Sequence, residues 1–132
     1  MTAVLDVCGA MEIILQKGKA EKFAAVLQEA SLVIAPDLYI PELTNTLWKY
    51  NTAKVLTETD CIQYIQDGIN YIDKFITSAE LWQEAFAEAI HCKHPVYDML
   101  FMITARRNRG VLITCDSVLA SLCKKNNVQV CF

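Results

Sequence analysis

The segment "VLITCDSVLASLCKKNNVQVCF" (residues 111–132) contains three successive patterns that indicate the fold. Residues 111–116 are an apolar run that ends on Asp116, as expected for a buried strand. Residues 117–127 carry apolar side chains at helical spacing, and residues 128–132 form a second short strand-like run. A strand, a helix and a strand in this order predict a parallel pair joined by a crossover helix.

The rest of the chain repeats this alternation. The apolar runs at 4–5 and 32–37 are predicted strands, and 71–77 is a weaker candidate. Such strands, apolar along nearly their whole length, are typical of a parallel sheet covered by helices on both faces. We therefore predict an α/β fold with a parallel sheet, and helices over 9–18, 19–31, 39–56, 57–68, 78–94 and 95–110.

Three of these helices carry specific signals. Helix 57–68 opens with a Thr-x-x-Asp capping pattern and is predicted to stop at Gly68. Ser78 is the predicted cap of the next helix. That helix is expected to turn one apolar side inward, and helix 95–110, apolar nearly all round, is expected to be buried. The predicted inward side consists of Leu81, Trp82, Phe86 and Ile90.

Length and composition favour one compact domain. The chain has 132 residues, of which 54% are hydrophobic and 20% charged, as expected for a single well-buried core. No apolar run approaches the roughly 20 residues that a spanning helix needs. The N-terminus has no basic segment followed by an apolar stretch, so we expect no signal peptide and a cytoplasmic location.

The six cysteines include no Cys-x-x-Cys pair. In a chain without a secretion signal they are expected to be reduced and to pack as small apolar side chains. The cluster "HCKH" (91–94) lacks a second Cys or His pair to complete a zinc site. A helix C-terminus with cations near the negative end of its dipole is the favoured interpretation.

The formal net charge of −3 disfavours a general nucleic-acid-binding protein. It does not exclude nucleic acid as a substrate, because a local basic patch would be enough. Each basic group is first interpreted as a solvated helix end. These groups are Lys17, Lys19 and Lys22; Arg106, Arg107 and Arg109; and Lys124 and Lys125.

Two acids follow predicted strands directly. Asp6 comes after the run at 4–5, and Asp116 ends the run at 111–116. Ligands of open α/β sheets bind beyond the carboxyl ends of the strands, so these acids would meet there if their strands are neighbours. Asp116 could also be an ordinary helix cap, whereas Asp6 is harder to explain by structure alone.

Two more acids lie near helix starts. Asp98 shares a helical stripe with Phe101 and Met102, so it is expected to face the core, where a lone charge is costly. Glu42 heads a helix whose polar side carries Asn45, Thr46 and Lys49. Either acid could instead interact favourably with a helix dipole.

Several carboxylates in one place repel one another unless a hard cation neutralises them. Mg²⁺ and Mn²⁺ prefer such oxygen ligands and keep several waters. A metal held in this way lowers the pKa of a bound water and stabilises charge on phosphate oxygens. The four acids together therefore predict metal-dependent hydrolysis of phosphodiesters.

Four segments carry a resemblance to a known family. They are "VLDVCGAMEII" (4–14), "APDLYIPELTNTLWK" (35–49), "HPVYDMLFMITARR" (94–107) and "GVLITCDSVLASLCKK" (110–125). In order and separation they resemble the motif blocks of the PIN-domain family, especially its VapC-like toxins of toxin–antitoxin pairs. The resemblance implies one domain over residues 1–132, with a five-stranded parallel sheet in the order 3-2-1-4-5. It also implies an Mg²⁺- or Mn²⁺-dependent endoribonuclease, a small antitoxin partner and a homodimer, whose interface we expect near residues 43–56.

The same resemblance implies roles for single residues. Asp6, Asp98 and Asp116 would hold the metal, directly or through water. Glu42 would bind metal or orient the attacking water. Those four acids would form the active site, with Asn45 and Thr114 as supporting or substrate-binding neighbours.

The chain departs from the family pattern at the first block. Cys8 stands where the family usually has Ser, Thr or Asn, and a thiol is a poorer hydrogen-bonding group than a hydroxyl. Gly9 follows where larger residues are common, and a further acid after the last block is missing. These differences leave open weaker metal binding and a catalytically inactive PIN-like interaction module.

Two other enzymatic or signalling classes are disfavoured. A phosphatase of the haloacid-dehalogenase type would have a second Asp at position 8, and a response regulator would have an acidic pair near the first strand.

Overall fold

The computed structural model describes all of residues 1–132, and it contains a five-stranded sheet. All neighbouring strands are parallel, and the order β3-β2-β1-β4-β5 confirms the expected topology. The central strand β1 pairs with β2 on one side and with β4 on the other. The strands are β1 (Thr2–Leu5), β2 (Leu32–Pro36), β3 (Lys74–Ile76), β4 (Val111–Ile113) and β5 (Gln129–Cys131).

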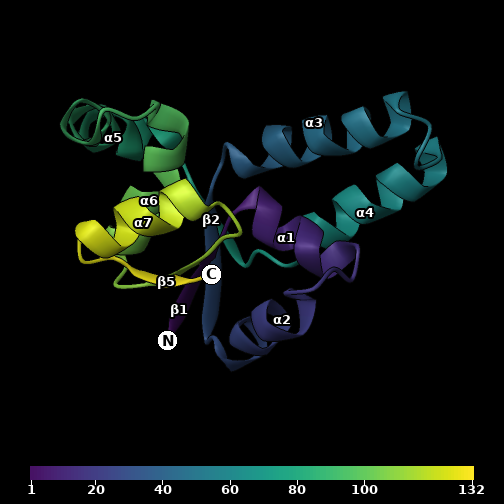
Figure 1. Ribbon diagram of the computed structural model, residues 1–132, viewed down its shortest axis with the longest axis horizontal. Helices are drawn as coiled ribbons and strands as arrows, with labels where there is room; N and C mark the ends of the chain where they lie inside the picture. Colours follow the sequence, from purple (N-terminus) through teal and green to yellow (C-terminus); the bar gives the residue numbers. More distant parts are fainter.

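Seven helices connect the strands and cover both faces of the sheet. Figure 1 shows α1 and α2 on one side of the sheet and α5, α6 and α7 on the other. Helices α3 and α4 pack against each other and extend outward from the sheet (Figure 1). None of the helices is long and apolar enough to cross a bilayer. The helices are α1 (Val7–Ile14), α2 (Ala20–Glu29), α3 (Tyr39–Thr52), α4 (Glu58–Asn70), α5 (Ser78–Cys92), α6 (Val96–Arg107) and α7 (Ser117–Lys125).

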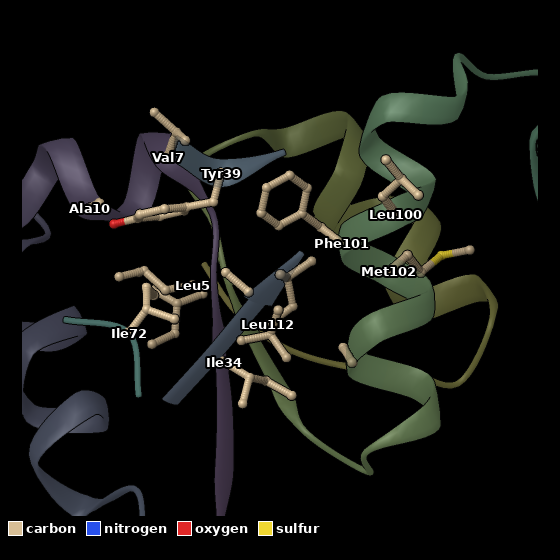
Figure 2. Packing of buried hydrophobic residues seen from close by; sticks show 14 of the residues in the cluster. Leu5, Val7, Ala10, Ile34, Tyr39, Ile72, Leu100, Phe101, Met102 and Leu112 are labelled. Atoms are coloured by element: carbon tan, nitrogen blue, oxygen red, sulfur yellow. The ribbon is translucent and has the colours of Figure 1, made fainter. Parts of the chain in front are cut away.

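The core lies between the sheet and the helices on each face. Residues 3–5 of β1 and residues 99–105 of α6 are all buried, which confirms the predicted burial of these two segments. Figure 2 shows Phe101 pointing from α6 toward Tyr39, with Leu5 near the centre of the same cluster. Burying both faces of β1 explains why its sequence is continuously apolar rather than alternating.

Gly68 lies inside α4 and does not end it, because the helix continues to Asn70. A Cβ at Gly68 would lie 2.6 Å from Cδ2 of Leu43, a fully buried side chain of α3. The Tyr39 hydroxyl also donates a 2.7 Å hydrogen bond to the Gly68 carbonyl. The glycine is therefore needed where α3 and α4 approach closely, and its interpretation as a stop signal was wrong.

The inner face of α3 is part of the core. Leu43 and Leu47 are fully buried, so they cannot supply the dimer interface expected near residues 43–56. The exposed apolar side chains of this region are Ile40, Trp48 and Val55.

Helix α5 is rotated relative to the prediction. Thr77, not Ser78, caps it by accepting a hydrogen bond from the Ala79 amide. Leu81 and Ala85 face the core, but Trp82, Phe86 and Ile90 are 60%, 58% and 64% exposed. These three residues, spaced four apart, form one exposed apolar stripe along the outer side of the helix.

Ion pairs join α5 to α6. Arg106 contacts Glu84 and Glu88, each at 2.9 Å, and Arg107 contacts Glu84 at 2.6 Å. Two of the three arginines in this basic group therefore neutralise acids of a neighbouring helix. They do lie at a helix end, in the last turn of α6, but their charges are paired, so they are not available as a basic patch.

Candidate active site

The ends of β1 and β4 bring the first and last motif blocks together. Leu5 lies opposite Ile113, and the Asp6 amide donates to the Ile113 carbonyl at 3.2 Å. Asp6 caps α1 by accepting a 2.8 Å hydrogen bond from the Gly9 amide, and the residue is only 6% exposed. The acid that follows the first strand is therefore buried at the carboxyl edge of the sheet.

Cys8 takes part in this hydrogen-bonding network. Its thiol donates to the two Asp6 carboxylate oxygens at 3.1 and 3.3 Å and lies 3.4 Å from the Thr114 hydroxyl. The thiol also accepts a 3.1 Å hydrogen bond from the Cys115 amide. Burial, followed by the charge of Asp6, raises the pKa of Cys8 well above its usual range, so the thiol stays protonated as a donor. The unusual residue in the first block therefore still orients Asp6.

The pKa values of two carboxyls show that their negative charge is poorly compensated. Burial raises the pKa of Asp6 to about 6, against the opposing effect of hydrogen bonds from Thr114, Gly9 and Cys8. Burial also raises the pKa of Glu42 to about 7, and the charges of Asp98 and Asp6 add to this shift. Neither Asp6 nor Glu42 belongs to any of the four salt bridges. The charges of Asp6, Glu42 and Asp98 thus repel one another, and of the three only Asp98 has a basic partner within the chain.

Asp98 lies near this region, but it does not face the core. It stands in the first turn of α6, and its side chain is 35% exposed. Its Oδ2 atom lies 2.6 Å from Nε2 of His94, four residues earlier. The prediction of a core-facing Asp98 was wrong because the buried part of α6 begins only at Met99.

Asp116 is exposed and caps α7. Its Oδ1 atom accepts hydrogen bonds from the amides of Val118 and Leu119, at 2.9 and 3.0 Å. The Thr114 hydroxyl, which is fully buried, accepts from the Asp116 amide at 3.0 Å. Capping, the ordinary explanation considered for this acid, is confirmed, and its Oδ2 atom makes no hydrogen bond within the chain.

A third acid that follows a strand, Asp37, was not predicted to be important. Asp37 follows β2 and accepts hydrogen bonds from the amide and hydroxyl of Ser78 at the start of α5. The Ser78 hydroxyl is the main reason why the pKa of Asp37 is lowered. Asp37 therefore links the end of β2 to the start of α5, and its carboxylate is stabilised by these hydrogen bonds.

The four predicted acids are not arranged as a complete set of metal ligands in this structure. No group of three or more His, Cys, Asp or Glu side chains is arranged to hold a metal ion. The chemistry of the donors nevertheless fits a hard divalent cation, because Asp6, Glu42 and Asp98 offer carboxylate oxygens whose charges are coupled. This set suits Mg²⁺ or Mn²⁺ better than a thiophilic metal, since Cys8 is held as a protonated donor.

A pocket of about 460 Å³ lies between α1 and α3; we call it the α1–α3 pocket. Of the four predicted acids only Glu42 lines it, while Cys8 and Cys115, close to Asp6 and Asp116 in the chain, line its inner end. Glu42, Asn45, Thr46 and Lys49 all line it, which confirms the predicted polar side of this helix. Lys17, Tyr50 and Cys115 also line the pocket, although their sequence context did not predict a site role for them. Of these three, only Cys115 could have been recognised from the sequence, because it stands between Thr114 and Asp116. The remaining lining residues are Val7, Cys8, Met11 and Glu12.

Gly9→Ala is expected to destabilise the protein and disturb Asp6. A Cβ at this position would lie 2.9 Å from the Ile113 carbonyl oxygen and 3.2 Å from Asp6 Oδ1. Because a strand backbone cannot retreat cheaply, we expect a loss of about 1–3 kcal/mol in unfolding free energy, measured by urea denaturation. Gly18→Ala is the matched control, since nothing lies within 4 Å of the added methyl. Equal stabilities for the two variants would contradict this account of Gly9.

Comparison with known proteins agrees with this architecture. No family model matches the chain. Over 122 residues the chain is 25% identical to Ribonuclease VapC3 of Pyrobaculum aerophilum, covering 91% of this chain and 93% of that protein.

Two solved structures share the fold. PAE2754 from Pyrobaculum aerophilum superposes with a TM-score of 0.73 at 18% identity, over 92% of this chain and 87% of that one. VapBC2 from Rickettsia felis, bound to a DNA fragment from its promoter, gives 0.67 at 11% identity, over 98% and 97%. The strand order and these two superpositions confirm the expected PIN-like fold, and over most of its length the chain is similar in sequence to Ribonuclease VapC3.

Proposed function

We propose that the protein is an Mg²⁺- or Mn²⁺-dependent endoribonuclease that hydrolyses RNA phosphodiester bonds, and that it is the toxin of a toxin–antitoxin pair. The observation that carries the proposal is the uncompensated charge of Asp6 and Glu42 beside a pocket of about 460 Å³. A buried carboxylate without a cation is costly unless a ligand supplies one. The curated relative, itself named a ribonuclease, supports the same reaction.

The proposed roles follow from the chemistry of each side chain. Asp6, Asp98 and Asp116 would hold the metal, which when bound supplies an activated water and charge stabilisation on the phosphate. Asp6 is oriented for this by the Gly9 amide and the Cys8 thiol.

Glu42 would act on the attacking water. A carboxyl with a pKa of about 7 can accept a proton near neutral pH, so Glu42 suits a general base as well as a metal ligand. Asn45 lines the pocket one turn further along α3 and would contact substrate, whereas Thr114 supports Asp6 and Asp116.

Cleavage of RNA in the presence and absence of metal tests the proposal. Purified protein is incubated with mixed tRNA and with structured RNA, in Mn²⁺, Mg²⁺ or EDTA. We expect discrete cleavage products with either metal and none in EDTA. Products that persist in EDTA would contradict a metal-dependent mechanism.

A non-catalytic PIN-like interaction module is the second candidate. It is favoured by the lack of a finished metal constellation and by the exposed apolar stripe on α5. Such a module would show neither cleavage nor a rise in melting temperature with Mn²⁺, whereas clustered carboxylates that bind metal should stabilise the fold.

We propose two protein partners. A small antitoxin would inhibit by covering the acidic region with a basic side chain, and the VapBC2 structure is a precedent for such a pair. Co-expression with a small neighbouring reading frame should then suppress the nuclease. A second copy of the chain would cover exposed apolar residues of α3 or α5, and light scattering would report a dimeric mass.

With all six cysteines free, we place the protein in the reducing cytoplasm.

A further inference from the structure

The two ends of the α1–α3 pocket carry opposite charge. Helices α1 and α3 both begin near the carboxyl edge of the sheet and extend away from it (Figure 1). Cys8 and Glu42, early in these helices, line the end nearest the acids. Lys49, two turns after Glu42, and Lys17, just beyond α1, line the pocket further out.

The two lysines of the pocket have no acidic partner. Neither Lys17 nor Lys49 belongs to a salt bridge, and the Lys17 ammonium donates only to the Tyr50 hydroxyl, at 3.3 Å. Glu12, the other acid of the pocket, accepts a hydrogen bond from the Lys19 amide. The pocket therefore presents cationic groups available to an anion, a short distance from a group of carboxylates.

Four other cations, all from the basic groups singled out in the sequence, are already engaged. Arg106 and Arg107 pair with acids of α5. The Lys22 ammonium donates to the Phe132 carbonyl at 2.6 Å, and the Lys19 ammonium lies 3.5 Å from the centre of the Phe132 ring. Of the basic group at 17–22, only Lys17 is directed to the pocket, which distinguishes it from its neighbours in sequence.

We propose that Lys17, Lys49 and Tyr50 form a subsite for the RNA backbone next to the cleaved phosphodiester. This inference rests on the proposed ribonuclease activity and identifies how one side of the substrate is held. Seven helical residues separate Glu42 from Lys49, a rise of about 10 Å, so the lysines contact a neighbouring phosphate rather than the reacting one. Tyr50 holds the Lys17 ammonium over the pocket, which makes it a positioning residue.

A polyanion fits this arrangement better than a protein segment. The unpaired lysines at one end attract phosphates directly, with or without metal, and a cation bound by the acids at the other end would attract the neighbouring phosphate. A single strand crossing the pocket would satisfy both ends. Lys17 and Lys49 are exposed, so their replacement should change surface stability little.

Salt-dependent RNA binding tests the subsite without requiring cleavage. We would measure the affinity of a short, labelled single-stranded RNA of mixed sequence in EDTA, over a series of salt concentrations. For single strands, log K falls with log salt by about 0.7 per neutralised phosphate, so K17Q/K49Q should reduce the slope by about 1.4. The control K124Q/K125Q removes two lysines from the last turn of α7 and should leave the slope unchanged.

Cleavage kinetics provide an independent test of the subsite. With Mn²⁺ present, K17Q/K49Q should raise KM several-fold and leave kcat nearly unchanged, because the lysines do not touch the reacting phosphate. Tyr50→Phe should produce a smaller change in the same direction.

The outcomes separate this inference from the proposed function. An unchanged salt slope in K17Q/K49Q, with RNA still bound and cleaved, would overturn the subsite alone and leave the pocket to a protein segment. A wild-type protein that neither binds nor cleaves RNA would overturn both the ribonuclease proposal and the subsite. A reduced slope in K17Q/K49Q, but not in K124Q/K125Q, supports the subsite.

Discussion

Asp6→Asn is expected to abolish RNA cleavage and, without metal, to make the protein more stable. The activity should fall because Asp6 is the most buried of the four acids and the proposed metal ligand at the centre of the sheet edge. Changing even an outer partner of a metal site costs about 10- to 100-fold in activity, so losing a ligand should cost at least that much. The same RNA cleavage assay in Mn²⁺ measures this loss.

The gain in stability has a separate cause. At pH 8 Asp6 is ionised although burial raises its pKa from 3.8 to about 6, which corresponds to a cost on the order of 3 kcal/mol. Asn carries no charge, and its side-chain oxygen can still accept the hydrogen bond from the Gly9 amide. Thermal unfolding in EDTA at pH 8 should therefore show a melting temperature several degrees above that of the wild type.

In Mn²⁺ the wild type should become more stable than Asp6→Asn, the reverse of the order expected in EDTA. The metal is expected to stabilise the wild type and to have little effect on Asp6→Asn, since the charge that attracts it has been removed. Glu29→Gln removes one exposed carboxylate of α2 and should change neither property. A variant Asp6→Asn that is less stable than the wild type in EDTA would show that a group of the chain already compensates this charge.

The three central strands of the sheet were predictable because they are almost entirely apolar. Burial on both faces leaves no position for a polar residue, so β1, β2 and β4 stand out against the surrounding helices. The strand order came from the resemblance of four blocks, not from the strands themselves. The polar side of α3, from Glu42 to Lys49, was also predictable, because helical spacing alone determines which side chains share a face.

The misassigned features depend on contacts between distant segments. Spacing along α6 aligned Asp98 with buried residues, but it could not show that the first turn projects beyond the core. The side of α5 that faces inward is determined by α6, where arginines pair with Glu84 and Glu88. Likewise, only the folded chain brings Lys17 to Tyr50, 33 residues later. Local pattern therefore predicts a helix and its faces, and tertiary packing selects the face that is buried.

Without metal, the stability of the protein is expected to fall as the pH rises from about 5 to about 8. In the folded state, the pKa values of Asp6 and Glu42 are raised from 3.8 and 4.5 to about 6 and about 7. Between the ordinary and the raised values the native state binds more protons than the unfolded state, so stability decreases with pH. The stabilising contribution is fully present below the ordinary values and is lost as the pH passes the raised ones. Asp37 and Glu84, whose pKa values are lowered, lose their contribution only at more acidic pH.

Melting temperatures recorded in EDTA and in Mn²⁺ across this pH range test the prediction. Metal must displace the protons held by Asp6 and Glu42, so the stabilisation by Mn²⁺ should grow from pH 5.5 to pH 8, with release of protons on binding. In EDTA, the melting temperature of Glu42→Gln should change less with pH near pH 7 than that of the wild type. Glu29→Gln should show the same dependence of melting temperature on pH as the wild type. If metal-free stability instead rises between pH 5 and pH 8, the pKa values of Asp6 and Glu42 are not raised in the folded state. In that case the proposed metal site loses its main support.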